Sequence, residues 1–353
     1  MGLAALTRQT LLRAWTRRGV LAWLLWPASC LYRLLWLIHR RTYRIGWRQV
    51  QHAAVPVIVV GNVVAGGAGK TPVVLALVAH FQLRGLRPGV VARGYGRRPQ
   101  DCRAVLAQSH PDDVGDEPLL IHRRTGVPVY VAATRFDAAH ALLAAHPDVD
   151  LLIADDGLQH LGLHRDIEIC VFDERGVGNG FLLPAGPLRE PWPRPVDLVL
   201  HGGSTPVRSD AWQFHRTLAS HAIAADGTRH LLSDLQRSTS DTAKPLRAVA
   251  GTARPEAFFS MLRGLGLHLD RTQALADHAT FDACDWADQG SDTVLCTEKD
   301  AVKLWRYRPD ALAVPLLLHV DPGFWHALDR LVRERAPASV ATKLSSGHGY
   351  TPS

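Results

Sequence analysis

The sequence predicts an α/β fold in which a parallel sheet has helices on both faces, and two observations support this prediction. From residue 55 onward, short apolar runs alternate with stretches of helical character. Strands separated by helices favour a parallel sheet. The first of these runs is followed by a glycine-rich loop and then by an apolar helix. In sheets of this kind, ligands bind at the carboxyl ends of the strands.

The glycine-rich loop belongs to the segment VPVIVVGNVVAGGAGKTP, residues 55–72, which begins with a predicted strand at 55–60. Glycines let the backbone fold around phosphate oxygens, and the free N–H groups of the loop and the helix start point at them. Lys70 is then placed to contact the β- and γ-phosphates of a nucleotide, and Thr71 to bind Mg²⁺. The expected ATP-binding residues are Val64, Ala65, Gly66, Gly67, Ala68, Gly69, Lys70 and Thr71.

One residue departs from the strict phosphate-binding pattern, which has glycine where this chain has Val64. A glycine-rich turn after a core strand is the alternative interpretation. The Gly-Lys-Thr triplet and the apolar helix that follows it favour a nucleotide site, and therefore a P-loop NTPase-like sheet.

The chain divides into five parts, of which the first, residues 1–50, consists of basic amphipathic helices predicted to contact a membrane. In the P-loop core, residues 51–205, a helix is predicted at 134–145 and further strands at 88–92, 127–132, 150–154, 167–172 and 196–200. A hinge or linker follows at 206–244, in which 212–218 reads as one strand of a hairpin. A smaller C-terminal α/β domain is predicted at 245–335, with strands at 246–250, 293–296 and 314–320 and helices at 255–265 and 324–335. The Ser-, Thr- and Gly-rich residues 336–353 are predicted to be disordered.

Charge is distributed unevenly along the chain. The formal net charge is +7, but no Asp or Glu occurs before Asp101, and the first 100 residues carry 14 Arg and one Lys. Such a basic segment favours a polyanionic partner: nucleic acid, an anionic membrane or a phosphorylated substrate. The five cysteines are scattered without a CxxC pair, which argues against a zinc site or disulfide framework and suits a reducing cytoplasm.

Residues 1–50 interleave Leu, Trp and Arg, in two apolar stretches on either side of Pro27. The longest uncharged run, residues 19–32, has 14 residues, whereas a membrane-spanning helix needs about 20. The pattern is typical of amphipathic helices that lie in the membrane interface. A helical hairpin packed on the protein core is the alternative, and both interpretations hold if one face meets protein and the other lipid. Long Leu and Trp runs are poor partners for nucleic acid.

Two acidic residues, Asp155 and Asp156, directly follow the predicted strand at 150–154. Carboxylates at that position, beside a phosphate-binding loop, are where such folds hold Mg²⁺. The alternative is a pair of turn residues that cap a helix. Two adjacent acids are costly unless a cation neutralises them, which favours the metal site.

Three further segments carry polar residues suited to chemistry. Asp116 in a loop and Asp277-His278 in the second domain can form an acid–histidine pair that deprotonates a hydroxyl, although a helix cap and a structural histidine are the alternatives. Arg189, in the Pro-rich loop 183–191, can stabilise charge on a transferred phosphoryl group, unless this is only a surface turn. Residues 297–300 follow a predicted strand. They are interpreted either as a loop that contacts adenine or ribose or as the capped start of a helix.

Taken together, these segments resemble the tetraacyldisaccharide 4′-kinase family, the lipid A 4′-kinases of Gram-negative bacteria. The matching segments occur in order over most of residues 55–303 and are GNVVAGGAGKTP (61–72), ARGYGRR (92–98), VGDEP (114–118), ADDGLQH (154–160), LPAGPLREP (183–191), AGTARPEAFF (250–259), ADH (276–278) and TEKDAVK (297–303). The ordered set is highly specific, whereas each segment alone is weak.

The resemblance implies that ATP phosphorylates the 4′-hydroxyl of a tetraacylated glucosamine disaccharide 1-phosphate, giving lipid IVA at the cytoplasmic face of the inner membrane. It also implies a P-loop core, a smaller C-terminal domain on a β-ribbon hinge and a membrane-contacting N-terminal helix. ATP is the co-substrate, and the expected partners are the lipid substrate and the anionic membrane surface, with no nucleic acid, in a peripheral or monotopic monomer.

The resemblance also implies roles for individual residues. Asp116 falls on the proposed base and His278 on the histidine that supports it, although Ala279 replaces the polar residue that often follows. The remaining assignments are Lys70 and Arg189 on phosphates and Thr71, Asp155 and Asp156 at Mg²⁺.

A membrane-associated P-loop switch ATPase is the main alternative function. Those proteins carry a signature Lys near the start of the loop, where this chain has Ala65, and they do not need the Asp-His or LPAGPLRE segments. A nucleotide-binding scaffold without chemistry is a third possibility, which the carboxylates around the Lys-Thr pair disfavour.

Overall fold

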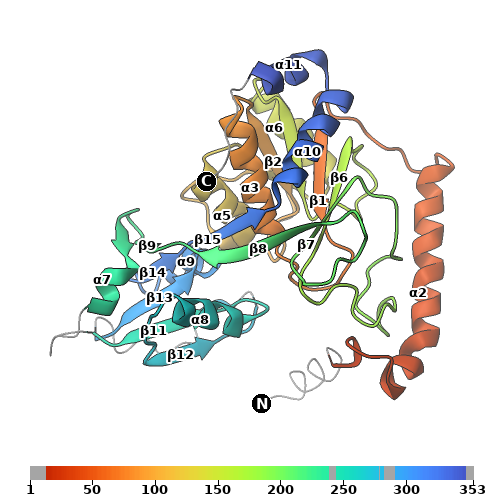
Figure 1. The fold of residues 1–353 in the computed structure, drawn as a ribbon. Coiled ribbons are helices and arrows are strands. Elements are labelled where there is room, and N and C mark those ends of the chain that lie inside the picture. Colours follow the sequence, from red (N-terminus) through yellow and green to blue (C-terminus); the bar gives the residue numbers. More distant parts are fainter. Residues whose placement is uncertain (1–12, 238–243, 278, 282–290, 347–353) are drawn as a thin grey trace.

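The computed structural model of the chain describes residues 13–237, 244–277, 279–281 and 291–346, which form two α/β units (Figure 1). The larger unit contains a nine-stranded sheet of order β15-β8-β7-β6-β1-β5-β2-β4-β3. Its central strands pair in parallel, so their carboxyl ends share one edge. The strands are β1 (Val57–Gly61), β2 (Pro88–Ala92), β3 (Arg103–Ala104), β4 (Val129–Val131), β5 (Leu151–Asp155), β6 (Ile167–Phe172), β7 (Leu198–His201), β8 (Trp212–Leu218) and β15 (Leu316–Val320).

Helices cover both faces of this sheet. Because alternate residues of a strand point to opposite faces, Ile58 and Val60 of β1 pack into one core and Val57 and Val59 into another. The first core is covered by α3 (Lys70–Leu83), α5 (Asp116–Thr125) and α10 (Pro322–Arg335), and the second by α6 (Arg135–Ala145). A short α4 (Pro111–Val114) precedes α5. The predicted fold class is confirmed.

The smaller unit contains a six-stranded sheet of order β10-β9-β14-β13-β11-β12. Strands β14, β13, β11 and β12 pair in parallel, while β9 pairs antiparallel with both of its neighbours. Its elements are β9 (His221–Ile223), β10 (Arg229–Leu231), α7 (Leu232–Arg237), β11 (Leu246–Ala250), α8 (Pro255–Gly264), β12 (Arg271–Ala274), β13 (Thr293–Thr297), α9 (Glu298–Leu304) and β14 (Leu312–Val314).

A two-stranded ribbon connects the units. Strand β8 leaves the large sheet and β15 returns to it, paired antiparallel from Leu218↔Leu316 to Phe214↔Val320. The sequence predicted one strand of a hairpin at 212–218, but the partner of this strand comes from about a hundred residues later in the chain. The end of the predicted second domain at residue 335 is also wrong, because Phe324 of α10 packs in the core of the larger unit.

The predicted disorder from residue 336 is wrong for α11 (Ala338–Ser346). Val340 and Leu344 are four residues apart, so they lie on one helical face, and both are buried in the first core. Residues 347–353 lie outside the described part.

Among the described residues of the front end, α2 (Val20–Arg44) is continuous, with Pro27 inside it. The two apolar stretches are therefore one element, and no hairpin is seen among the described residues. An interior proline costs about 3 kcal/mol, which the helix-favouring Leu and Ala around it offset. Figure 1 shows α2 along the larger unit, on the side away from the smaller one. By length and composition alone α2 could cross a membrane, and 11% of its most apolar window is buried.

Candidate functional site

The glycine-rich loop leaves β1 at Gly61 and is organised by a buried asparagine. The Asn62 Nδ2 group donates to the carbonyl oxygens of Val64 and Gly66, and its Oδ1 accepts from Lys70 Nζ at 3.3 Å. Helix α3 begins at Lys70 after Gly69, whose φ of 77° favours glycine. The strand, the loop and the helix that begins at Lys70 follow one another as the sequence predicted, and phosphate binding by this loop stays a prediction.

Val64 does not disturb this cradle. Its side chain is buried in the second core, and its backbone forms a bridge with Leu188, next to the hydrogen bond from Ala65 N to Pro187 O. The side chain therefore points into protein. This placement explains why the chain tolerates a branched residue at position 64.

Two arginines that the sequence analysis missed cover the outside of the loop. Arg175 donates to Gly67 O at 2.9 Å, and Arg216 of β8 donates to Ala68 O at 3.3 Å. A Cβ atom on Gly69 would lie 2.2 Å from Arg216 Nη2, so a larger residue at this position would displace the guanidinium group of Arg216. Neither arginine lies in a recognisable motif, and only the folded chain brings them to the loop.

The acidic pair lies at the carboxyl end of β5, beside Lys70. Asp156 has a left-handed backbone conformation with φ of 48°. Its Oδ1 is 3.6 Å from Lys70 Nζ and 3.1 Å from Arg189 Nη1. Burial raises the pKa of this carboxyl, but the charges of Lys70 and Arg189 outweigh it and hold the pKa below its usual value.

Asp155 has the opposite electrostatics. Its Oδ1 is buried and has no hydrogen-bond partner. Burial, with the negative charge of Glu117, raises the pKa of Asp155 to about 7. A buried, unsatisfied carboxylate oxygen next to a second acid fits a hard cation with oxygen ligands. The described residues contain no cluster of three or more His, Cys, Asp or Glu, so Thr71 and non-protein ligands would have to complete such a site.

Arg135 holds this turn in place. The buried guanidinium donates to the backbone carbonyls of Asp155 at 2.9 Å and of Asp156 at 2.7 Å. It thereby aligns the two acids, and its positive charge acts to lower the pKa of both carboxyl groups. The sequence analysis missed this residue, which is the first of α6 and carries no motif.

Replacing Asp155 by asparagine should stabilise the nucleotide-free protein at pH 8, by on the order of 1–3 kcal/mol. A carboxyl whose pKa is raised on folding stabilises the protein below its unfolded pKa, and this contribution is lost as pH rises through about 7. Asparagine carries no charge to bury at any pH. The gain in unfolding free energy of the D155N protein over the wild type should therefore shrink towards pH 5, where the buried Asp155 is protonated. Urea unfolding at both pH values, with EDTA present, measures the difference. The control is Asp148→Asn, which removes a carboxylate from an exposed ion pair. If the D155N protein is no more stable than the wild type at pH 8, burial of the ionised Asp155 carboxylate does not destabilise the folded protein.

Asp116 lies where the two units meet. It is the first residue of α5, is buried, and its Oδ2 lies 2.6 Å from Lys303 Nζ of α9. Its neighbour Glu117 shares Lys299 with Asp277, at 3.2 Å from each carboxylate. Asp277 comes from the smaller unit and Glu117 from the larger one. The ion pairs of Lys299 with both carboxylates therefore bring the segment of Asp116 close to the segment of Asp277. His278 itself lies outside the described residues.

The segment at 297–300 contains a capped helix start. The Thr297 side chain accepts from Asp300 N at the beginning of α9, and Asp300 accepts from Gly251 N at 3.0 Å. Lys299 and Lys303 of the same helix make the ion pairs with the larger unit described above. This segment therefore links the units, and contact with adenine or ribose stays untested.

The Pro-rich loop carries Arg189 to the acidic pair and is anchored on α2. Tyr32 donates from its hydroxyl to Arg189 O at 2.6 Å, and Ser29 donates to Leu182 O at 2.8 Å. The side chain of Gln159 donates to both Asn62 O and the buried Glu190. The phosphate-binding loop, the acidic pair and the arginine loop are thus one hydrogen-bonded network.

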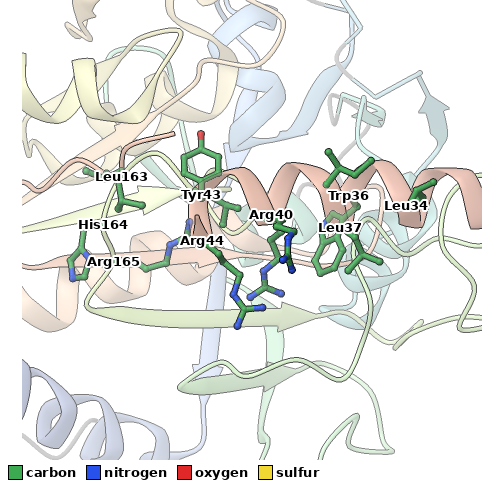
Figure 2. A pocket seen from close by; sticks show the side chains of 13 residues that line it. Leu34, Trp36, Leu37, Arg40, Tyr43, Arg44, Leu163, His164 and Arg165 are labelled. Atoms are coloured by element: carbon green, nitrogen blue, oxygen red, sulfur yellow. The ribbon is translucent and has the colours of Figure 1, made fainter. Parts of the chain in front are cut away.

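Two adjoining cavities separate α2 from the core. The smaller, of about 380 Å³, reaches Gln159, Arg189 and Glu190. The larger, of about 810 Å³, lies under the C-terminal half of α2 (Figure 2). Trp36, Arg40 and Leu161 line both. The two cavities therefore adjoin along α2, between Arg189 and Arg44.

Comparisons with known proteins identify relatives of this chain. A sequence model of the family described as LpxK, tetraacyldisaccharide-1-P 4′-kinase, matches residues 21–333. The chain is 55% identical to a tetraacyldisaccharide 4′-kinase of Verminephrobacter eiseniae, over 94% of this chain and 79% of the relative. It is 54% identical to that of Acidovorax sp., over 95% of each. The structure is similar, with a TM-score of 0.75 and 25% identity, to a crystal structure of "apo" form LpxK from Aquifex aeolicus in complex with ATP, covering 88% of this chain and 99% of that one.

Proposed function

This chain belongs to the tetraacyldisaccharide 4′-kinase family, an ATP-dependent kinase family of lipid A synthesis, and from that premise we propose which residues carry the reaction. The 4′-hydroxyl of a tetraacylated disaccharide 1-phosphate accepts the γ-phosphoryl group of ATP. One observation supports this proposal most strongly: Lys70 and Arg189 converge on Asp156 at the edge of a cavity that follows α2. Phosphate-binding cations and a lipid-facing helix thus meet at one place.

The loop N–H groups and Lys70 would hold the β- and γ-phosphates, and Arg189 would face the transferred group from the other side. Asp155, Asp156 and Thr71 would hold Mg²⁺, which neutralises phosphate charge when it is bound. The present ion pairs of Asp156 with Lys70 and Arg189 keep both cations at the site before a nucleotide arrives.

Asp116 would accept the proton of the 4′-hydroxyl, with His278 acting beside it. The hydroxyl oxygen then bonds to the γ-phosphorus while the bond to the β-phosphate oxygen breaks, and ADP leaves. The ion pair with Lys303 at 2.6 Å orients the Asp116 carboxylate. Because Lys303 belongs to the smaller unit, the position of that unit bears directly on the base.

The assay that tests the proposal is phosphoryl transfer from ATP to the disaccharide lipid, with the position of the new phosphate identified in the product. Transfer to the 4′-position supports the assignment. ATP hydrolysis that does not depend on the lipid would indicate a switch ATPase instead, and an absence of turnover would indicate a nucleotide-binding scaffold.

We also propose that α2 binds the cytoplasmic surface of the inner membrane. Its exposed face carries large apolar residues, including Val20, Leu24 and Leu31, each more than half exposed. No acidic residue occurs in the first 50 positions, where nine Arg are found. Basic residues near an anionic surface each contribute about 1 kcal/mol, and salt screens this contribution. The apolar face supplies a contribution that salt does not remove.

Substituting Leu24 and Leu31 by glutamine should weaken binding to anionic vesicles by about 10-fold or more, since two exposed leucines no longer enter the interface. The apparent KM for the bilayer-held lipid should rise far more than that for ATP. Deletion of residues 1–45 should likewise weaken vesicle binding and raise the apparent KM for the lipid. It also removes Ser29 and Tyr32, which anchor the Arg189 loop. Vesicle sedimentation at low and high salt measures the effect.

Leu83 at the end of α3 offers a matched control, because it is 66% exposed but lies outside α2. Leu83→Gln should bind vesicles like the wild-type protein. Equal binding by the wild-type and L24Q/L31Q proteins would assign the helix to protein contacts instead.

A further inference from the structure

The larger cavity beside α2 combines an apolar wall with a group of basic side chains. Leu34, Trp36 and Leu37 line its inner part, and Arg40, Arg41 and Arg44 follow them along the helix. His164 and Arg165 face them from the connection between β5 and β6. Figure 2 shows Arg40 and Arg44 projecting from α2 towards the side where Arg165 lies. No acidic residue lines this cavity.

The arginines that α2 contributes differ from the arginines that the larger unit contributes to the two cavities. Arg189 is paired with Asp156, and Arg165 with Glu168 at 2.8 Å. In the described part of the chain, Arg40, Arg41 and Arg44 make no ion pair, and Arg40 lies over the ring of Trp36 at 5.1 Å. Glu190, which lines the adjoining cavity, lies within electrostatic reach of Arg40. Guanidinium groups without an ion pair in one concave site still raise the local positive potential, which attracts an anion. The planar donor geometry of arginine suits a phosphate group in particular.

The position of these arginines along α2 suggests which phosphate they meet. The bond from the Tyr32 hydroxyl to Arg189 O fixes the helix relative to the arginine that faces the transferred phosphoryl group. Arg40 and Arg44 lie eight and twelve residues further on, or about 12 and 18 Å along a helix. The family description names an acceptor with a phosphate at position 1 and the reacting hydroxyl at position 4′. These groups stand at opposite ends of a disaccharide, a separation comparable to the distance from Tyr32 to Arg40.

We propose that Arg40 and Arg44 bind the 1-phosphate of the acceptor. The disaccharide would then be held at both ends, with its 1-phosphate in this basic cavity and its 4′-hydroxyl near Arg189. The inference rests on the proposed function and adds a specificity determinant to it. The two cavities share Trp36, Arg40 and Leu161 and so lie next to each other along α2. A molecule that reaches from Arg189 into the larger cavity would bring its own phosphate there, which favours the phosphate of the acceptor over that of a surrounding phospholipid.

The test compares two acceptors, the tetraacylated disaccharide with its 1-phosphate and the same lipid with a free 1-hydroxyl, in micelles of a neutral detergent. The wild-type enzyme should show a lower KM for the phosphorylated acceptor by about 10-fold or more, as charge-assisted hydrogen bonds to arginine require. Arg44→Gln and the double variant R40Q/R44Q should lose most of this preference by raising KM for the phosphorylated acceptor alone. Arg44→Lys should retain part of it.

The matched control is Arg33→Gln, which removes the same charge from an exposed position of α2 that lines neither cavity. This variant should retain the wild-type preference. An unchanged preference in R40Q/R44Q would overturn the proposal, as would a loss of anionic-vesicle binding without a change in preference, because the arginines would then serve membrane phospholipids. If the wild-type protein phosphorylates neither acceptor, the proposed function fails. Equilibrium binding of the two lipids to wild-type and R44Q proteins still decides the phosphate contact in that case.

Discussion

Replacing Lys70 by alanine should lower kcat for phosphoryl transfer by about 10²- to 10³-fold, the usual cost of removing one group that stabilises charge in the transition state. The Lys70 ammonium lies at the start of α3, 3.3 Å from Asn62 Oδ1 and 3.6 Å from Asp156 Oδ1. Asp156 keeps its ion pair with Arg189 after the substitution, so the acidic turn retains a cation. Steady-state kinetics at saturating ATP measure the loss, and thermal unfolding should show a folded protein.

Lys343 is a suitable control, because its ion pair with Asp150 is on the surface away from the phosphate-binding loop. Lys343→Ala should keep wild-type turnover. Near wild-type turnover by the K70A protein would refute the assignment of this loop as the phosphate site.

Replacing Asp116 by asparagine should lower kcat by roughly 10²- to 10⁴-fold, the contribution typical of a general base. The KM for ATP should change little, because Asp116 lies at the start of α5 and not in the phosphate-binding loop. Asparagine keeps the shape of the side chain but cannot take the proton. Single-turnover measurements of phosphoryl transfer would isolate this step from product release.

The ion pair to Lys303 requires its own control, since loss of the Asp116 charge also weakens a contact between the units. Lys303→Met breaks the same pair and keeps the carboxylate, so its kcat should fall much less. If His278 acts with Asp116, the double variant should be hardly worse than the worse single one. Fully additive losses would show that the two residues act separately, and equal losses in D116N and K303M would reduce Asp116 to an inter-unit contact.

Local patterns in the sequence were sufficient for the elements of the larger unit. The run of residues 55–60 is apolar throughout because β1 is buried on both faces. Glycines mark the loop because Gly66 and Gly69 have positive φ angles. The acids Asp155 and Asp156 could be placed at the sheet edge because they end a buried strand. Each of these features depends on residues adjacent in the chain.

Long-range placement could not be predicted in the same way. The partner of β8 is about a hundred residues away, and α10 returns to the first core although it follows the smaller unit. The periodicity of α10 marks an apolar face but does not say which core receives it. The helix α11 was missed because its Ser- and Thr-rich composition hides two buried apolar residues, Val340 and Leu344.

The sequence by itself determined the family, the glycine-rich loop before α3 and the acidic turn after β5, because each is a pattern of neighbouring residues that does not depend on the rest of the chain. Only the tertiary structure decided that Arg175 and Arg216 cover the loop and that Arg135 holds the acidic turn. It also decided that Tyr32 ties the basic helix to Arg189. The physical reason is that a guanidinium or hydroxyl group acts over about 3 Å, so its role is set by what the fold brings within that distance.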